Sequence, residues 1–454
     1  MEPFTTAGLI KQIRLAVESH PDNRSGNNLT YTLLDAVLGA FSAFFIQSPS
    51  FLAYQRTMQE TQGRNNAQSL FSLVNIPSDN QIRNLLDDLP PKLFHPVFRY
   101  CVEGINETGI LDSFRTESGD LIIAIDGTGY FSSEKIHCDN CTIKIYDKES
   151  DKPKKRYEHT VLTPVIVSPQ TTDVIPLEPE HIIPQDGEDK QDCENKAAKR
   201  WLKKHGEYYS QYNATVVGDD LYAHQPLCKD LQSAGLHFIL VCKPESHQSL
   251  YTWVNELEEE GKNKQTVTIR SWDEKLKTHT IATYHFANNV PLRDTDDSIA
   301  VNWLEVTIKD EKTDKQIYHN SFITDHILTE ETVQEIVAAG RARWHIENGN
   351  NNTLKTKGYH FEHNYGHGKT NLSLILTTLI IIAFLFHTML SHTSEAYQNL
   401  REKLPRQTFF AHIQALTSYL YFDNWDHLFA FMEQGLKKRF AIKDLESMLK
   451  PTPG

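Results

Sequence analysis

Cysteine is scarce in this sequence, with six residues among 454. A disulfide-stapled secreted scaffold needs a much denser set, so we expect the protein to reside in a reducing cytoplasm. Basic residues are also in the minority: 46 Lys and Arg stand against 59 Asp and Glu, which gives a formal net charge of −13. This balance argues against a protein that coats nucleic acid without specificity, so any contact with DNA must come from local basic patches.

A secretory signal and long apolar runs are two further features that are absent or rare in the sequence. The N-terminus has no basic segment followed by an apolar one, so we expect no secretory signal. Long uncharged apolar runs are limited to residues 372–390, a length near the minimum for a membrane span. Because Ser, Thr and His interrupt this run, we expect a buried core helix and no membrane contact. A membrane-associated hydrolase anchored by this run is the alternative.

The rest of the composition, 39% hydrophobic and 23% charged, is that of a globular protein. Residues 1–115 carry helical periodicity and predict a helical N-terminal domain. Its short helix over residues 81–86 presents Gln81, Arg83 and Asn84, which would suit a DNA groove. An ordinary solvated helix face is the simpler interpretation.

From residue 116 the pattern changes to an α/β fold, a mixed sheet flanked by helices. Short apolar runs predict buried strands at residues 121–125, 161–167, 174–177, 215–218 and 236–242. Helical segments at residues 192–205 and 224–234 separate the later strands. The first part of this domain covers residues 116–245, an antiparallel β-rich insertion covers 246–327, and the second part covers 328–395. A helical C-terminal region, residues 396–454, follows.

Three acids stand where a metal site would form. Asp126 and Asp219 end two buried strands, and the ligand sites of α/β sheets gather at that edge. Glu347 lies in a predicted helix that begins near residue 329, in which Arg343, Glu347, Asn351 and Lys355 follow at steps of four and share one stripe. Three such carboxylates can hold a pair of divalent cations that prefer oxygen ligands.

Two other acids compete for these roles. Asp220 is the rival of Asp219, but it points to the other side if the strand continues. Glu362 is the rival of Glu347, but it lies in a Gly-rich loop, which supports a ligand less rigidly than a helix does.

The segments around these acids resemble those of bacterial insertion-sequence transposases with an RNase H-like core and an Asp-Asp-Glu triad. The matching stretches are residues 122–129 (IIAIDGTG), 216–222 (VVGDDLY) and 341–347 (RARWHIE). The family's third motif reads Tyr-x-x-Arg-x-x-x-Glu followed by Lys seven residues after the Glu. Here Gly340 replaces the Tyr and Lys355 comes one residue late, so the roles of that Tyr and Lys do not transfer directly.

The resemblance implies the function. Asp126, Asp219 and Glu347 would be the catalytic residues and the ligands of two Mg²⁺ ions, with Mn²⁺ as a substitute. The reaction would be phosphodiester hydrolysis and strand transfer on double-stranded DNA, at transposon ends and a target, by a homodimer at the bacterial nucleoid. A domesticated non-catalytic DNA-binding protein and a plain metal-dependent nuclease are the alternatives.

Local charge supports contact with DNA. Residues 144–156, 190–205 and 341–369 each hold more bases than acids. Within the last segment we expect four phosphate-binding side chains: Arg341, Arg343, Lys355 and Lys369.

Cys138 and Cys141 have the spacing of half a zinc site. A complete site needs two more ligands, for which His159, His181 and Cys193 are the nearby candidates. Since the pattern shows no second pair, zinc is an option here, but we expect two ordinary thiols.

Overall fold

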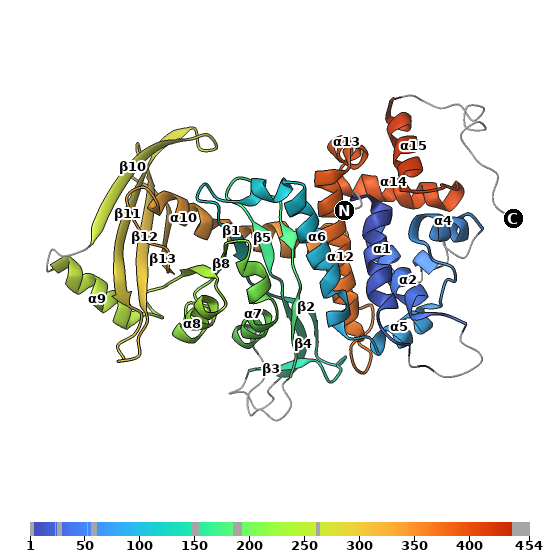
Figure 1. Ribbon diagram of the computed structural model, residues 1–454, viewed down its shortest axis with the longest axis horizontal. Helices are drawn as coiled ribbons and strands as arrows, with labels where there is room; N and C mark the ends of the chain where they lie inside the picture. The colour runs from blue at the N-terminus through green and yellow to red at the C-terminus, as the bar shows by residue number, and fades with distance from the viewer. Residues whose placement is uncertain are drawn as a thin grey trace.

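The computed structural model describes residues 4–22, 24, 30–51, 53–55, 61–147, 154–184, 193–259 and 264–437. Its main sheet has nine strands in the order β10-β11-β12-β13-β9-β8-β1-β5-β6 (Figure 1). The five strands at one end of this order are β1 (Leu121–Ala124), β5 (Val165–Val167), β6 (Ile175–Pro176), β8 (Ala214–Gly218) and β9 (His237–Val241). β1 runs parallel to β8 and β8 to β9, whereas β5 is antiparallel to both β1 and β6. The predicted RNase H-like mixed sheet is therefore confirmed.

The inner strands β1 and β8 form because their residues are apolar on both faces of the sheet. Every residue of β1 and of β8 is buried, as strands covered by helices on both sides must be. The covering helices are α7 (Glu194–Ser210), α8 (Gln225–Ser233) and α10 (Val333–Ala342). α7 packs against α8, and both α8 and α10 contact β9.

The predicted β-rich insertion extends the main sheet instead of forming one of its own. Its strands are β10 (Gln265–Asp273), β11 (Thr278–Pro291), β12 (Ala300–Asp310) and β13 (Gln316–Thr324), each antiparallel to the next. β13 pairs with β9, so these four strands continue the sheet at the left of Figure 1. The segment also contains a helix, α9 (Gln248–Glu259), which the period-two pattern of its neighbours did not predict.

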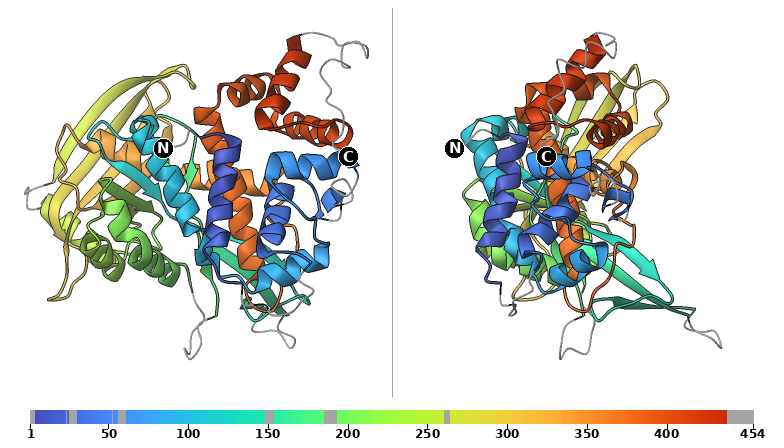
Figure 2. Two further views of the ribbon diagram at one scale, coloured as in Figure 1. Left: turned by 45° about the vertical axis from the view of Figure 1, so that its right-hand side comes forward. Right: turned by 90° about the vertical axis from the view of Figure 1, so that its right-hand side faces the viewer.

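A second, smaller sheet is formed by β2 (Gly127–Ser133), β3 (Thr142–Tyr146), β4 (Lys154–Leu162) and β7 (Glu180–Ile182). It projects from the body of the protein, as the right view of Figure 2 shows. The chain passes from β1 into β2 through Ile125 and Asp126, and from β4 into β5 through Thr163 and Pro164. The predicted single strand over residues 161–167 is thus two strands, and the break falls at a proline, which has no N–H for a ladder.

The other helices gather in one lobe. They are α1 (Thr6–Glu18), α2 (Leu33–Phe45), α4 (Thr61–Phe71), α5 (Asp79–Asp87), α6 (His95–Glu107), α12 (Leu372–Thr393), α13 (Glu395–Lys403), α14 (Arg406–Tyr419) and α15 (Trp425–Lys437), with short 3₁₀ turns at Pro91–Phe94 and Ile110–Phe114. α12 contacts α2, α5 and α6, and α14 contacts α4, so helices from both ends of the chain lie side by side (Figures 1 and 2). The domain boundaries near residues 115 and 396 remain predictions.

α12 contains the apolar run and is the centre of this lobe. Among the described residues it is the one helix long and apolar enough to cross a membrane, yet that apolar window is buried inside the protein. Three of its polar side chains have partners: Thr377 and Thr378 donate to the carbonyls of Ser373 and Leu374, and Nδ1 of His387 lies 2.7 Å from the Tyr359 hydroxyl. The prediction of a buried core helix is confirmed.

The short helix predicted near residue 81 is α5, capped by Ser78. Its Arg83 is only partly exposed and is engaged within the protein, because Nε donates to the Tyr365 carbonyl at 2.7 Å and Nη1 to Asp79 at 2.8 Å. Gln81 and Asn84 are exposed. Contact of this helix with DNA stays a prediction. Arg83 would have to give up these hydrogen bonds before its guanidinium could contact a base.

Candidate active site

The two strand-end aspartates are neighbours because of strand register. Ala124 of β1 pairs with Val217 of the parallel strand β8. Asp126 and Asp219 each stand two residues beyond these partners, at the same edge of the sheet. The close position of these two acids follows from the parallel pairing, as parallel strands end at one edge.

Asp219 and its rival Asp220 have different surroundings. Oδ1 of Asp219 accepts the nearby N–H of Leu221, at 2.9 Å, which orients the carboxylate by a local turn. Asp220 accepts from the backbone N–H of Lys243 at 2.6 Å and from the Ser246 hydroxyl at 2.5 Å. Asp220 is thus occupied in fixing the loop after β9, which supports Asp219 as the site acid.

Glu347 lies on a π-helix, Ile346–Asn351, between α10 and α11 (Asn352–Thr356). π-helical turns are rare and occur often at functional sites. The Arg343 guanidinium forms an ion pair with Glu347, with Nη1 2.8 Å from Oε1, and the Glu347 side chain is about half exposed. The predicted regular helix from residue 329 is wrong in two respects, because α10 begins at Val333 and the wider π turn breaks the stripe of i+4 positions.

Asn351 therefore does not share an exposed stripe with Glu347, as the regular helix predicted. Its side chain is buried. Its Oδ1 accepts from the Thr163 hydroxyl at 2.9 Å, and the Thr163 N–H donates to the carbonyl of Asp126 at 3.0 Å. Thr163, at the break between β4 and β5, thereby ties the helix of the third acid to the backbone of the first.

A fourth acid, Glu194, was not predicted. It is the first residue of α7, and its carboxyl lies so close to Gly127 that a Cβ there would be 2.4 Å from Glu194 Cδ. The hydroxyl of Tyr222, a buried residue of the VVGDDLY stretch, lies 3.4 Å from Oε2 of Glu194. A helix-starting acid is an ordinary capping signal in sequence, so only the tertiary packing against Gly127 reveals it.

The gathered carboxylates disturb one another. Burial raises the pKa of Asp126 to about 7, and the negative charges of Glu194, Glu347 and Asp219 add to the rise while Arg343 opposes it. Burial and the charge of Asp219 likewise raise the pKa of Glu194. The edge of the sheet thus concentrates more negative charge than its one neighbouring arginine offsets.

This donor set fits divalent cations in its chemistry. All four side chains offer hard carboxylate oxygens, which Mg²⁺ and Mn²⁺ prefer, and a cation would relieve the repulsion that raises the pKa of Asp126. The carboxylates have not closed into a tight ligand set, however. Within the described ranges, no triplet of these four acids has its ligand atoms all within 4.8 Å of one another.

The expected phosphate-binding residues divide among three places. Arg341 and Arg343 line one groove of about 780 Å³ with Lys275, Tyr318 and the half-exposed Trp344, and Arg341 lies over the Tyr318 ring at 4.4 Å. Lys355 lines a second hollow of about 720 Å³ near Arg406, and its Nζ lies 3.1 Å from Glu362. That contact makes Glu362, the rival acid, a partner of Lys355. Lys369 is exposed and belongs to neither lining.

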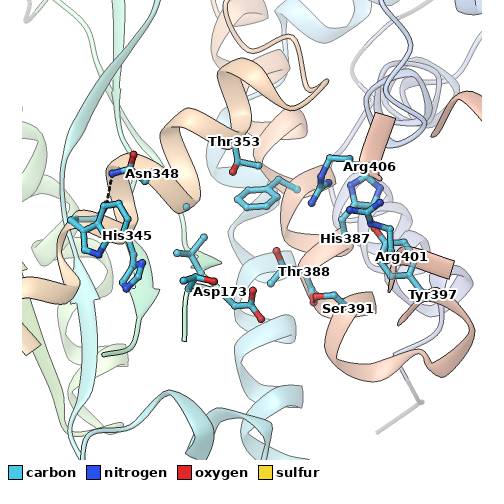
Figure 3. A pocket seen from close by; sticks show the side chains of 15 residues that line it. Asp173, His345, Asn348, Thr353, His387, Thr388, Ser391, Tyr397, Arg401 and Arg406 are labelled. Atoms are coloured by element: carbon cyan, nitrogen blue, oxygen red, sulfur yellow. Dashed lines mark hydrogen bonds between the residues drawn. The ribbon is translucent and has the colours of Figure 1, made fainter. Parts of the chain in front are cut away.

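A further cavity of about 490 Å³ separates the Glu347 helix from α12 and α13 (Figure 3). Asn348 and His345 face it from one side, and Arg401 and Arg406 from the other. None of the four acids lines it. The cavity thus lies behind the helix that carries Glu347 and not at the carboxylates.

Cys138 and Cys141 are not an isolated pair. His159 on β4 and His367, in the loop before α12, complete a cluster whose ligand atoms all lie within 4.8 Å of one another. Of the three candidates expected from sequence only His159 belongs to it, since His181 Nε2 lies instead beside the Thr378 hydroxyl at 3.3 Å and Cys193 is exposed. The second pair of potential ligands, which the sequence pattern did not show, is present because the fold brings His367 from more than 200 residues away.

The sequence was compared with models of protein families and with curated proteins. A family model described as "Transposase DDE domain" matches residues 117–386, more than half of the chain and a range that includes all four acids. No curated protein matches the chain.

Proposed function

The chain belongs to the transposase DDE-domain family, and we propose that it cuts and joins DNA at the ends of an insertion sequence. Its activity would be metal-dependent phosphodiester hydrolysis followed by strand transfer, with Asp126, Asp219 and Glu347 as the catalytic acids. The observation that carries this proposal is the parallel register of β1 and β8, which sets Asp126 beside Asp219, while Glu347 lies near enough to raise the pKa of Asp126.

Asp126, Asp219 and Glu347 would hold the two Mg²⁺ ions, with Mn²⁺ as a substitute and Glu194 as a further acid near Asp126. When bound, such ions activate an attacking hydroxyl and stabilise the leaving oxygen of a phosphodiester. The protein's own contribution is to hold the carboxylates. The β1–β8 register fixes two of them, and the link from Asp126 through Thr163 to Asn351 fixes the helix of the third.

Arg343 has two roles in this proposal. In the present structure its guanidinium neutralises Glu347 at 2.8 Å. If the Glu347 carboxylate turns toward the cations, the guanidinium is left at the groove shared with Arg341, where it can bind a phosphate in bidentate fashion. Arg343 would thus exchange a protein carboxylate for a DNA phosphate as the site fills.

The groove beside Arg343 is the proposed path of the DNA. It combines Arg341, Arg343 and Lys275 with Trp344, a residue that is 52% exposed. Cationic side chains bind the backbone, and an exposed aromatic ring offers a stacking surface for a base. Lys355 and Lys369 would contact phosphates outside this groove. Two transposon ends must meet for joining, so we propose a homodimer that acts in the cytoplasm, at the nucleoid.

The test uses a linear DNA that contains the gene with its flanking inverted repeats, incubated with the full chain and Mg²⁺. We expect cleavage at the repeats and joined products. The variants Asp126→Asn, Asp219→Asn and Glu347→Gln should lose cleavage but keep DNA binding in a gel-shift assay, because each removes a ligand charge without changing shape.

Asp220→Asn and Glu362→Gln are the matched controls, since both remove a carboxylate close to the site in sequence. They should retain cleavage. An active Asp219→Asn variant beside an inactive Asp220→Asn variant would show that the second acid is misassigned. Cleavage without any joined product would mark a plain nuclease, and DNA binding with no metal-dependent cleavage would mark a non-catalytic DNA-binding protein.

A further inference from the structure

The Cys/His cluster, Cys138, Cys141, His159 and His367, lies outside the acid site. Cys138 and Cys141 belong to the turn between β2 and β3, and His159 pairs with Phe131 across β4 and β2. His367 comes from the loop between α11 and α12. The cluster thus joins the small sheet to the helical lobe.

Its ligand-atom distances lie within about 0.3 Å of those around a tetrahedral zinc. Zinc bonds of about 2.3 Å to sulfur and 2.0–2.1 Å to nitrogen place the ligand atoms about 3.8 Å apart for S···S, 3.6 Å for S···N and 3.3 Å for N···N. Here the two sulfurs are 3.8 Å apart, and each lies 3.3 Å from His159 Nε2. His159 Nε2 lies 3.1 Å from His367 Nδ1.

The surroundings are those of a closed site. Cys141 and His159 are 4% and 1% exposed, whereas Cys138 and His367 are half-buried. The Cys138 N–H donates to Cys141 Sγ at 3.4 Å, which orients a sulfur lone pair within the turn. Aromatic rings hold both imidazoles: Tyr130 stacks on His159 with the ring centres 5.4 Å apart, and Phe131 meets His367 edge-on at 4.2 Å.

We propose that Cys138, Cys141, His159 and His367 bind one zinc ion that is structural and separate from the acid site. Two thiolates and two neutral imidazoles balance the charge of Zn²⁺, so a neutral unit is buried. Thiolates also select against Mg²⁺, which prefers oxygen. All four positions are taken by protein ligands, as in structural zinc sites, which leaves none for a substrate.

The zinc would fasten the loop of residues 357–371. The Asn140 side-chain amide, at the tip of the Cys turn, already donates to the Thr370 carbonyl. Asp87 at the end of α5 accepts the backbone N–H groups of Lys369 and of the next three residues, at 2.7–3.0 Å. Zinc at His367 would add a second anchor just before this cap, so the start of α12 would be held from both the sheet and α5.

The experiment measures metal in the full chain, purified in reducing buffer without chelator and then supplied with Zn²⁺. We expect about one zinc per chain by mass spectrometry. Replacement by Co²⁺ should give the strong visible bands of a tetrahedral thiolate site. This second readout is made on the wild type, so it does not depend on whether a variant folds.

Variants then assign the ligands. The double variant Cys138→Ser, Cys141→Ser and the single variant His367→Ala should lose the zinc, and His367→Cys should restore it, since zinc accepts three thiolates and one imidazole. The matched controls are Cys193→Ser and His363→Ala, an exposed cysteine and an exposed histidine outside the cluster. Glu347→Gln should also keep its zinc.

Several results would overturn the proposal. The first is a wild-type protein that takes up no zinc, or a Co²⁺ form with the weak spectrum of octahedral oxygen ligation. The second is zinc retained by the double cysteine variant. The third is a Cys138–Cys141 disulfide that persists in reducing buffer. Loss of zinc from Glu347→Gln as well would show that the metal belongs to the acid site.

Discussion

Asp126→Asn should stabilise the protein when metal is removed, although it should also abolish cleavage. Burial and three neighbouring carboxylates raise the pKa of Asp126 from 3.8 to about 7. A carboxyl group whose pKa is raised by folding binds more protons in the folded than in the unfolded state between these values. Its contribution to stability is therefore present below about pH 4 and is lost as pH rises through about 7.

The size of the effect follows from the shift. About three pKa units at 1.36 kcal/mol each set an upper limit of about 4 kcal/mol at pH 8. Relaxation of the neighbouring acids reduces this limit, so we expect a gain of about 2–3 kcal/mol for Asn at that pH. With an unfolding entropy near 1 kcal/mol/K for a chain of this length, the melting temperature should rise by about 2–3 °C.

The assay is thermal unfolding in EDTA at a series of pH values between 4 and 8, for wild type and variant. The difference should be near zero at pH 4 and largest at pH 8. Mg²⁺ at one hundred times Kd should about cancel the difference, because binding stabilises only the wild type, by about 2.7 kcal/mol, and at one thousand times Kd it should reverse the order, since the gain is then about 4.1 kcal/mol. Asp220→Asn is the control, since its carboxylate accepts hydrogen bonds from Lys243 and Ser246 and its loss should destabilise.

Two results would refute this reasoning. A difference in melting temperature between wild type and Asp126→Asn that does not vary with pH would show that folding does not raise the pKa of Asp126. A variant that gains as much from Mg²⁺ as the wild type would show that Asp126 is not a metal ligand.

Three other changes test the supporting structure. Thr163→Val keeps the shape but loses the donor to Asn351, so kcat should fall about tenfold while KM for DNA stays constant; an equal change in KM would mean that Thr163 contacts DNA. Ile381→Asp in α12 should unfold or aggregate the protein, since an unpaired buried charge costs several kcal/mol, whereas Leu15→Asp at an exposed position should not; equal solubility and melting would contradict the burial of α12. Asp87→Ala should lower the melting temperature at pH 7 but not near pH 2, because four backbone N–H donors outweigh burial and lower the pKa of Asp87; a loss that persists at pH 2 would point to packing instead.

The sequence predicted the elements that depend on local pattern. The buried strands β1 and β8 appear as short apolar runs that end in an acid, so Asp126 and Asp219 could be placed at one sheet edge before the structure was known. The burial of α12 was predictable from the polar residues within its apolar run. Each of these elements could be predicted from the residues of its own segment.

Glu194 and His367 escaped prediction because their roles are made by packing between distant segments. Glu194 matters through its contact with Gly127, and His367 through its approach to His159, more than 200 residues earlier in the chain. No spacing rule connects such positions. The zinc pattern looked incomplete since its second half is split between a strand and a loop in different parts of the fold.

The two departures from the family's third motif have structural reasons. A Cβ at Gly340 would lie 2.8 Å from the ring of Phe322, so α10 packs too closely on β13 for a Tyr at this position. The position of Lys355, eight residues after Glu347 instead of seven, is related to the π turn. In an α-helix each residue adds about 100°, so Lys placed seven residues after Glu shares its face, and one placed eight residues after is turned away. A π turn takes more residues to complete, and the one at Ile346–Asn351 absorbs the extra residue between Glu347 and Lys355. The π turn thus accommodates one more residue between Glu347 and Lys355, and Lys355 Nζ ends 3.1 Å from Glu362.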